Sequence, residues 1–169
     1  MTPETLADLL ETLVNFPSET GQEKALADWV TQRLAARGGG EILRSGHSVV
    51  WRGPSDSIAR PLLVLAGHLD TVPANGNATA RRVGDRLYGL GSTDMKSGDV
   101  VMLALLESLD PGDLRFDLAG GVLRRRGGPA RPEWLEAPAE RDAVAQGGAA
   151  RDPARAHRPA RSSSAATAR

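Results

Sequence analysis

Residues 61–73 read Pro-Leu-Leu-Val-Leu-Ala-Gly-His-Leu-Asp-Thr-Val-Pro. The segment begins with an unbroken apolar run, which is typical of a strand buried on both faces of a sheet. We therefore expect residues 61–67 to form a strand at the centre of the sheet. Polar residues follow where this strand ends, and α/β proteins bind their ligands at that end of their strands.

The first two polar residues after the run are His68 and Asp70. They are two residues apart, so in extended backbone both side chains leave the same face. An imidazole in this position can bind a metal ion, and a nearby carboxylate can orient the imidazole. In a simpler interpretation His68 is an ordinary hydrogen-bonded histidine and Asp70 caps the turn before Pro73. On these residues alone, both interpretations stand.

A second polar segment, Gly-Leu-Gly-Ser-Thr-Asp-Met-Lys-Ser-Gly at residues 89–98, opens a helical pattern over residues 96–109. Closely spaced glycines let the backbone approach a ligand. We expect Asp94 to lie at the start of the helix and to project its carboxylate toward His68, with helix capping as its alternative role. The segment lacks the Gly-Lys-Ser/Thr ending of a phosphate-binding loop, which argues against a nucleotide site.

The flanking sequence favours an α/β fold. Thr2 and Pro3 form a helix start, and apolar residues at helical spacing continue the helix to about residue 15. A second amphipathic helix through residues 25–34 ends at a run of glycines, and we expect both helices to lie on a sheet. The other expected elements are strands at residues 41–43, 48–51 and 115–118 and a hairpin at residues 83–88.

The net charge of zero conceals two unlike segments. Residues 1–118 carry a net charge of −5, whereas residues 119–169 carry +5 and consist largely of Ala, Arg, Gly and Pro. The second segment has too few large apolar side chains to offset its chain entropy. We therefore place the domain boundary at residue 118 and expect a disordered tail, with one short helix near residues 132–146.

The run Leu-Arg-Arg-Arg at residues 123–126 has an alternative interpretation as a basic arm for a polyanion or a partner. The tail contains almost no aromatic residue to stack on bases, which argues against nucleic acid as its ligand. The chain has no cysteine, which excludes disulfides, zinc fingers and a cysteine nucleophile and leaves His, Asp and Glu as metal ligands. With no signal peptide and no apolar stretch of roughly 18 residues, we expect a cytoplasmic protein without membrane contact.

Taken together, the two motifs resemble those of the co-catalytic zinc peptidase and deacylase family. This family includes succinyl-diaminopimelate desuccinylase, acetylornithine deacetylase, aminoacylase and carboxypeptidase G. The likeness rests on Gly-His-Leu-Asp-Thr-Val-Pro at residues 67–73 and on Asp94, which lies 26 residues after His68. It covers about residues 3–118, and it is nearest to the desuccinylases. It implies the N-terminal portion of a catalytic domain with a mixed sheet flanked by helices.

The resemblance also implies a site with two zinc ions, which cobalt can replace. His68 would be a ligand of one zinc, Asp94 the carboxylate that bridges both, and Asp70 the catalytic-site aspartate that holds the histidine in place. The implied reaction is hydrolysis of N-succinyl-diaminopimelate to succinate and diaminopimelate in lysine biosynthesis. Other N-acyl amino acids, such as acetylornithine, are the alternative substrates, and the family forms homodimers through a lid domain.

The likeness fails after residue 118. In the family a strand at that point leads to two adjacent glutamates, one the general base and one a zinc ligand, whereas this sequence contains no Glu-Glu pair. We therefore expect a truncated or frameshifted enzyme, without its lid domain, that is inactive alone. An unpaired sheet edge and low solubility would follow. The alternative from another class is a non-catalytic half-domain that binds a polyanion or a partner.

Overall fold

The computed structural model describes residues 2–55 and 60–123, where four strands form a mixed sheet in the order β1-β2-β6-β3. Neighbours β1 and β2, and β2 and β6, are antiparallel, whereas β6 and β3 are parallel. The α/β class with a mixed sheet, expected from the sequence, is confirmed. The strands are β1 (Glu41–Ser45), β2 (Ser48–Arg52), β3 (Leu62–His68) and β6 (Asp117–Leu123).

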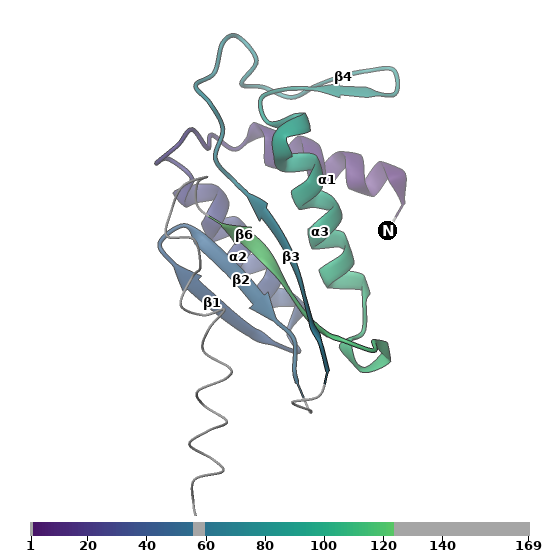
Figure 1. The fold of residues 1–169 in the computed structure, drawn as a ribbon. Coiled ribbons are helices and arrows are strands. Elements are labelled where there is room, and N and C mark those ends of the chain that lie inside the picture. The colour runs from purple at the N-terminus through teal and green to yellow at the C-terminus, as the bar shows by residue number, and fades with distance from the viewer. Residues whose placement is uncertain (1, 56–59, 124–169) are drawn as a thin grey trace, which may run out of the picture. The chain divides into compact units, whose positions relative to one another are not determined.

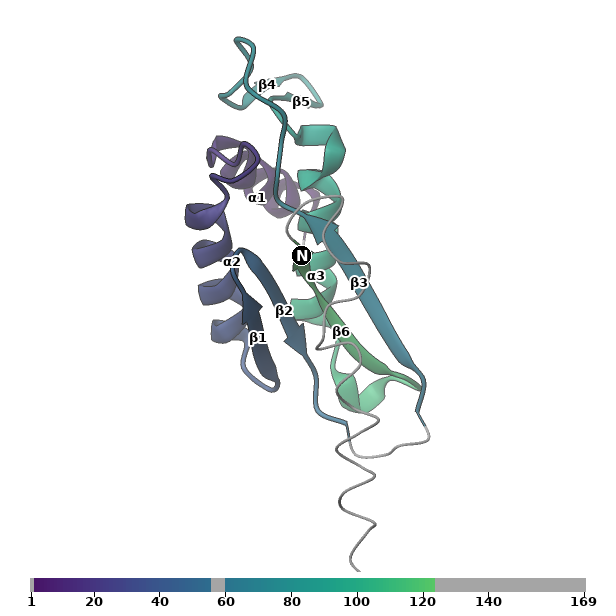
Figure 2. The same ribbon diagram turned by 60° about the vertical axis from the view of Figure 1, so that its left-hand side comes forward.

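Within the described part of the chain, three α-helices accompany the sheet (Figures 1 and 2). Helix α1 (Pro3–Asn15) begins as predicted, because Thr2 Oγ1 accepts a hydrogen bond of 3.2 Å from the N–H of Thr5. Helix α2 (Lys24–Arg37) ends at Gly38, whose φ of +66° favours glycine. Helix α3 (Ser97–Ser108) forms the crossover between β3 and β6 and packs on both strands.

Helix α1 packs on other helical segments rather than on the sheet, contrary to the prediction from its amphipathic pattern. Its neighbours are α3 and the single turn η1 (Ser92–Lys96), whereas α2 packs on β1 and β2. The apolar stripe of α1 is nevertheless buried at Leu9, Leu13 and Val14. A helical period shows which face is buried, but it does not show which element covers that face.

A hairpin of β4 (Arg81–Val83) and β5 (Arg86–Tyr88) confirms the turn predicted at residues 83–88. It lies beyond the end of β3 and is joined to α1 by ion pairs. Arg82 contacts Asp8 at 2.6 Å and Glu11 at 2.7 Å. These contacts anchor the hairpin from which the chain continues into the loop before α3. A short 3-10 turn, η2 (Pro111–Asp113), leads from α3 toward β6.

Strand β6 continues to Leu123, five residues beyond the boundary expected at Leu118. Two of the added residues are glycines at positions where a side chain would not fit. A Cβ atom on Gly121 would lie 2.0 Å from the carbonyl oxygen of Val49, and one on Gly120 would lie 2.9 Å from the methyl carbons of Leu106. The predicted end of the strand at Leu118 is thus wrong. Glycines bury little apolar surface, but here they fit a crowded strand that lies between β2 and β3.

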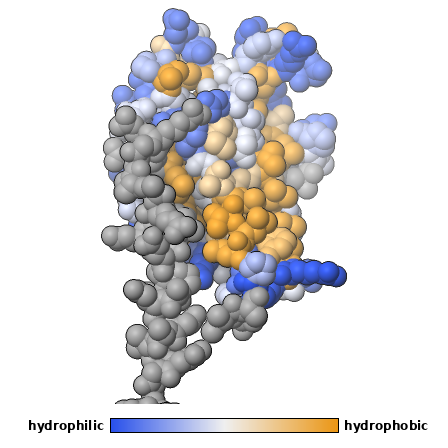
Figure 3. All heavy atoms as spheres, in the orientation of Figure 1, coloured by the Kyte–Doolittle hydropathy of each residue, from blue (hydrophilic) through white to orange (hydrophobic). Residues whose placement is uncertain are grey.

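Strand β3 lies at the edge of the described sheet, and the prediction that it lies at the centre is wrong. Leu62 and Leu63 are 40% and 43% exposed, so the strand is not buried on both faces. Figure 3 shows apolar side chains gathered over β3 and α3, where Val101 and Leu105 are also exposed. The apolar run correctly predicted a strand. Within residues 2–55 and 60–123, however, β3 pairs with β6 on one side and has no neighbouring strand on the other.

The expected disorder of residues 119–169 is wrong for residues 119–123, which form the end of β6. The remainder of the expected tail, with the helix near residues 132–146 and the arginines at 124–126, lies outside the described residues. Among the described helices, none has the length and apolar character needed to span a bilayer.

Replacing Leu63 with Lys is expected to reduce self-association of the protein. The change places a charge on an exposed, uncharged edge strand, where a further strand could otherwise add. Because Leu63 is 43% exposed, the free energy of unfolding should change by about 0.5 kcal/mol or less. Light scattering and gel filtration at rising concentration would measure the effect. Val83→Lys on the hairpin is the control, and an equal improvement from it would show that the edge is not responsible.

Candidate functional site

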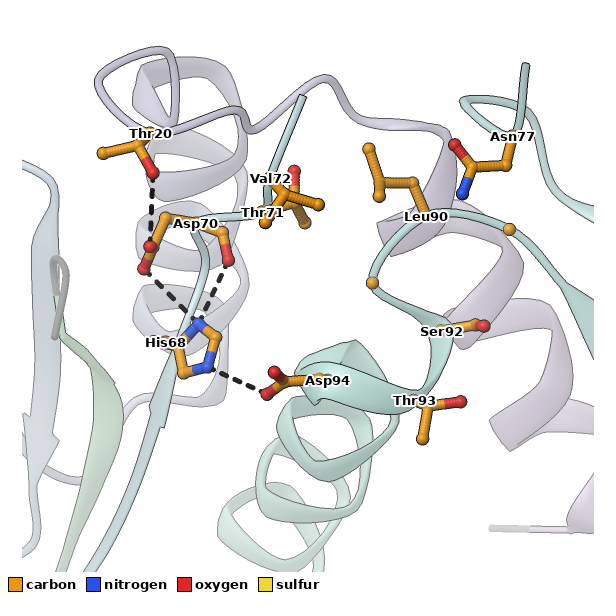
Figure 4. Close-up of a pocket in the computed structure, with 12 residues that line it drawn as sticks. Thr20, His68, Asp70, Thr71, Val72, Asn77, Leu90, Ser92, Thr93 and Asp94 are labelled. Atoms are coloured by element: carbon orange, nitrogen blue, oxygen red, sulfur yellow. Dashed lines mark hydrogen bonds and ion pairs between the residues drawn. The ribbon is translucent and has the colours of Figure 1, made fainter. Parts of the chain in front are cut away.

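A cavity of about 360 Å³ lies at the carboxyl end of β3. Its walls come from three parts of the chain that are distant in sequence. They are the turn after α1, represented by Thr20, the segment that follows β3, and the loop before α3. His68, Asp70 and Asp94 all line this cavity (Figure 4). The fold therefore brings the three candidate residues together.

His68 is the last residue of β3, and Asp70 holds one side of its ring. Nδ1 of His68 lies 3.1 Å from the backbone oxygen of Asp70 and 3.3 Å from its Oδ1. Thr20 Oγ1 contacts Oδ2 of the same carboxylate at 3.5 Å. A carbonyl oxygen only accepts hydrogen bonds, so the contact between Nδ1 of His68 and the backbone oxygen of Asp70 favours a proton on Nδ1. In the neutral ring, Nε2 then carries the lone pair that a metal ion requires.

Nε2 of His68 faces Asp94 across the cavity, 3.2 Å from its Oδ1. Two ligands of a tetrahedral zinc ion, with bonds of about 2.0–2.1 Å, are about 3.3 Å apart, so the observed spacing fits a shared metal ion. It also fits a hydrogen bond from a protonated imidazole to the carboxylate. Within the described residues, no group of three or more His, Cys, Asp and Glu side chains is placed to hold a metal. The pair thus fits two ligands of a larger set.

Asp94 precedes helix α3 by three residues instead of starting it. Its φ and ψ are −124° and 95°, so its backbone is not helical. The N-cap position belongs to Lys96, which makes no side-chain capping bond. The alternative role of Asp94 as the cap of this helix is therefore wrong, and the loop geometry instead directs its carboxylate toward His68.

The loop before α3 needs glycine at two positions for steric reasons. Gly91 has a φ of +77°, and a Cβ atom on it would lie 2.8 Å from Cγ2 of Thr71. A Cβ atom on Gly89 would lie 2.4 Å from Cγ1 of Val14. The glycines therefore let the loop pack directly against α1 and against Thr71 in the segment that follows β3, which brings Asp94 to the cavity.

Two charged residues near the cavity were not among the candidates from the sequence. Lys96 and Asp99 are 2% and 0% exposed. Burial lowers the pKa of Lys96 to about 8 and raises the pKa of Asp99 to about 7, and the charge of each residue opposes the shift of the other. A lysine and an aspartate three residues apart at the start of an otherwise apolar helix are the only sequence signal for this pair.

Gly91→Ala is expected to destabilise the protein by about 2–3 kcal/mol, because it combines a strained positive φ with a steric overlap at Thr71. Gly84→Ala is the matched control. Its φ is +58°, but no atom lies within 4 Å of the added Cβ, so it should cost only about 1 kcal/mol. Urea denaturation of both variants measures the difference. Equal losses would contradict the close packing of the loop against Thr71.

Residues 64–118 match peptidase family M20/M25/M40. A Mycobacterium tuberculosis protein named for succinyl-diaminopimelate desuccinylase is 46% identical over 103 residues, which are 60% of this chain and 28% of the relative. The succinyl-diaminopimelate desuccinylase of Corynebacterium glutamicum is 37% identical over 113 residues, which are 65% of this chain and 30% of the relative. The chain therefore spans less than a third of the length of these relatives.

The fold is similar to that of a solved tripeptidase from Staphylococcus aureus, with a TM-score of 0.59 and 22% identity. The match covers 72% of this chain and 36% of the tripeptidase. At this identity the likeness concerns the fold alone. The sequence matches confirm the resemblance predicted from the two motifs: residues 64–118 match peptidase family M20/M25/M40, and the chain is similar to part of succinyl-diaminopimelate desuccinylases.

Proposed function

We propose that this chain carries part of the active site of a metal-dependent hydrolase that cleaves the amide bond of an N-acylated amino acid. The observation that carries the proposal is the 3.2 Å separation of His68 Nε2 and Asp94 Oδ1 at the cavity. The identity of 46% to a protein named for a desuccinylase supports the reaction class.

His68 and Asp94 would hold the metal, which we propose to be zinc or, as a substitute, cobalt. A divalent ion at this place supplies a Lewis acid that polarises the amide carbonyl. Asp94 would also bridge to a second ion. In the catalytic site, Asp70 would accept the hydrogen bond from Nδ1–H of His68. The backbone oxygen of Asp70 lies 3.1 Å from Nδ1, and its Oδ1 lies 3.3 Å from Nδ1. Asp70 thereby fixes the direction of Nε2.

The proposed substrate is N-succinyl-diaminopimelate, hydrolysed to succinate and diaminopimelate for lysine biosynthesis. Such a reaction belongs in the cytoplasm. Among the described residues, those that line the cavity include Asp70 and Asp94 but no lysine or arginine. The groups that would bind the carboxylates of this substrate therefore lie outside the described part of the wall. N-acetylornithine is the alternative substrate within the same reaction class.

Cobalt binding tests the proposed ligands directly. His68→Ala is expected to weaken Co²⁺ binding by at least about tenfold, because it removes one of two donors. His47→Ala is the matched control, since Nδ1 of His47 also contacts a carboxylate, Oε2 of Glu23 at 2.8 Å, but does not line the cavity. Isothermal titration and the visible absorption of Co²⁺ measure affinity. Equal losses in the two variants would contradict a site at His68.

The purified 169-residue chain is expected to show no turnover of N-succinyl-diaminopimelate with added zinc or cobalt. Catalytic zinc sites use three protein ligands, and the sequence contains no Glu-Glu pair to supply the base. Release of a primary amine from N-succinyl-diaminopimelate and from N-acetylornithine measures the activity. Turnover that disappears in His68→Ala would show that the chain is an active enzyme by itself.

A further inference from the structure

Beneath the cavity, Lys96 and Asp99 contact the two segments that carry the proposed metal donors. We propose that Lys96 and Asp99 are positioning residues, which hold Asp94 and His68 at the separation that a metal ion requires. This inference rests on the proposed function, because it concerns the same two donors. It adds a role for two buried charges that touch neither the cavity nor the ion.

Lys96 ties the loop that carries Asp94 to the turn after α1. Its Nζ donates a hydrogen bond of 3.0 Å to the carbonyl oxygen of Phe16, and its backbone N–H donates one of 2.9 Å to the carbonyl oxygen of Gly91. Its stem lies beside Gly91, where an added Cβ would be 3.2 Å from Cδ of Lys96. Asp94 lies two residues earlier in non-helical backbone, so these anchors, rather than a helical ladder, fix its position.

Asp99 packs against the strand end that carries His68, the other proposed metal donor. Its Oδ1 occupies the space beside Gly67, where an added Cβ would lie only 1.9 Å away. Gly67 precedes His68 in β3, so the carboxyl group of Asp99 packs against the backbone that carries the imidazole. Any larger residue at position 67 would displace either Asp99 or the end of β3.

Stability alone gives a poor account of Asp99. Its side chain is fully buried, and neither carboxyl oxygen has a hydrogen-bond partner within the part of the chain that the structure describes. A buried polar group in this state costs free energy, and an apolar residue of similar size would stabilise the fold more. The contact that gives Asp99 a role is instead geometric, because its carboxyl group fills the space beside Gly67 at the end of β3. Lys96 and Asp99 lie at the start of the same helix, so we expect them to hold the two donor segments together.

The test compares Co²⁺ affinity in the full chain and in Lys96→Met, Asp99→Asn and the double variant. Binding is followed by the paramagnetic perturbation of the His68 imidazole signals in NMR spectra, and folding is followed by urea denaturation. The double variant removes both buried charges together, so its free energy of unfolding should stay nearer that of the parent than that of Lys96→Met. Its Co²⁺ affinity should nevertheless fall by about 10–100-fold, the usual effect of losing groups that orient metal ligands.

Arg33→Met/Glu107→Gln is the matched control for removal of an ion pair. Nε of Arg33 and Oε1 of Glu107 are 2.5 Å apart and join α2 to α3, and neither residue lines the cavity. This double variant should bind Co²⁺ within about twofold of the parent, because distant sites act independently.

Each outcome decides between the proposals. A parent chain that does not bind Co²⁺ at His68 overturns the proposed function and this inference with it. A parent chain that binds Co²⁺, together with a folded double variant of unchanged affinity, overturns this inference alone. If the double variant does not fold, Asp99→Asn decides, because it keeps the side-chain shape and gives up no hydrogen bond. Unchanged affinity in folded Asp99→Asn would then overturn the role of the pair.

Discussion

The parallel pairing of strands β3 and β6 is the constraint on which the candidate site depends. Parallel neighbours cannot be joined by a tight turn, so the chain must leave the carboxyl end of β3 and return through a crossover helix. Helix α3 is that crossover, and the loop that leads into it passes the end of β3. His68 at the strand end and Asp94 in the loop therefore converge because of the topology, although 26 residues separate them.

Close packing at glycines then sets the fine position of these elements. Gly121 lets β6 fit against Val49 of β2, Gly67 leaves room for Asp99, and Gly91 lets the loop approach Thr71. In each case the missing side chain is replaced by an atom from a distant part of the sequence. Gly67 and Gly91 are therefore explained by contacts within the protein, and a ligand is not needed to account for them.

Local signals predicted the elements well, and their arrangement less well. The cap at Thr2 and the hairpin near Gly84 depend on neighbouring residues, so the sequence reveals them. The edge position of β3 and the extension of β6 to Leu123 depend on strand pairing across the chain, which periodicity does not encode. At the site, the motifs predicted that His68, Asp70 and Asp94 would converge. The buried pair of Lys96 and Asp99 was missed, because charged residues are usually exposed and only tertiary packing shows otherwise.

The exposed edge of β3 and the two-ligand site have the same geometric origin. His68 ends the edge strand, so its imidazole lies at the margin of the sheet that the described residues form. A metal site of the proposed kind requires at least one further protein ligand beyond His68 and Asp94. On its inner side, β3 is paired with β6 from Leu62 to His68. Leu123, the last residue of β6, is the pairing partner of His68, so the carboxyl ends of the two parallel strands lie side by side. A further ligand that follows a strand end of this sheet would therefore lie close to His68, whereas the exposed Leu62 and Leu63 at the outer edge of β3 supply no metal donor.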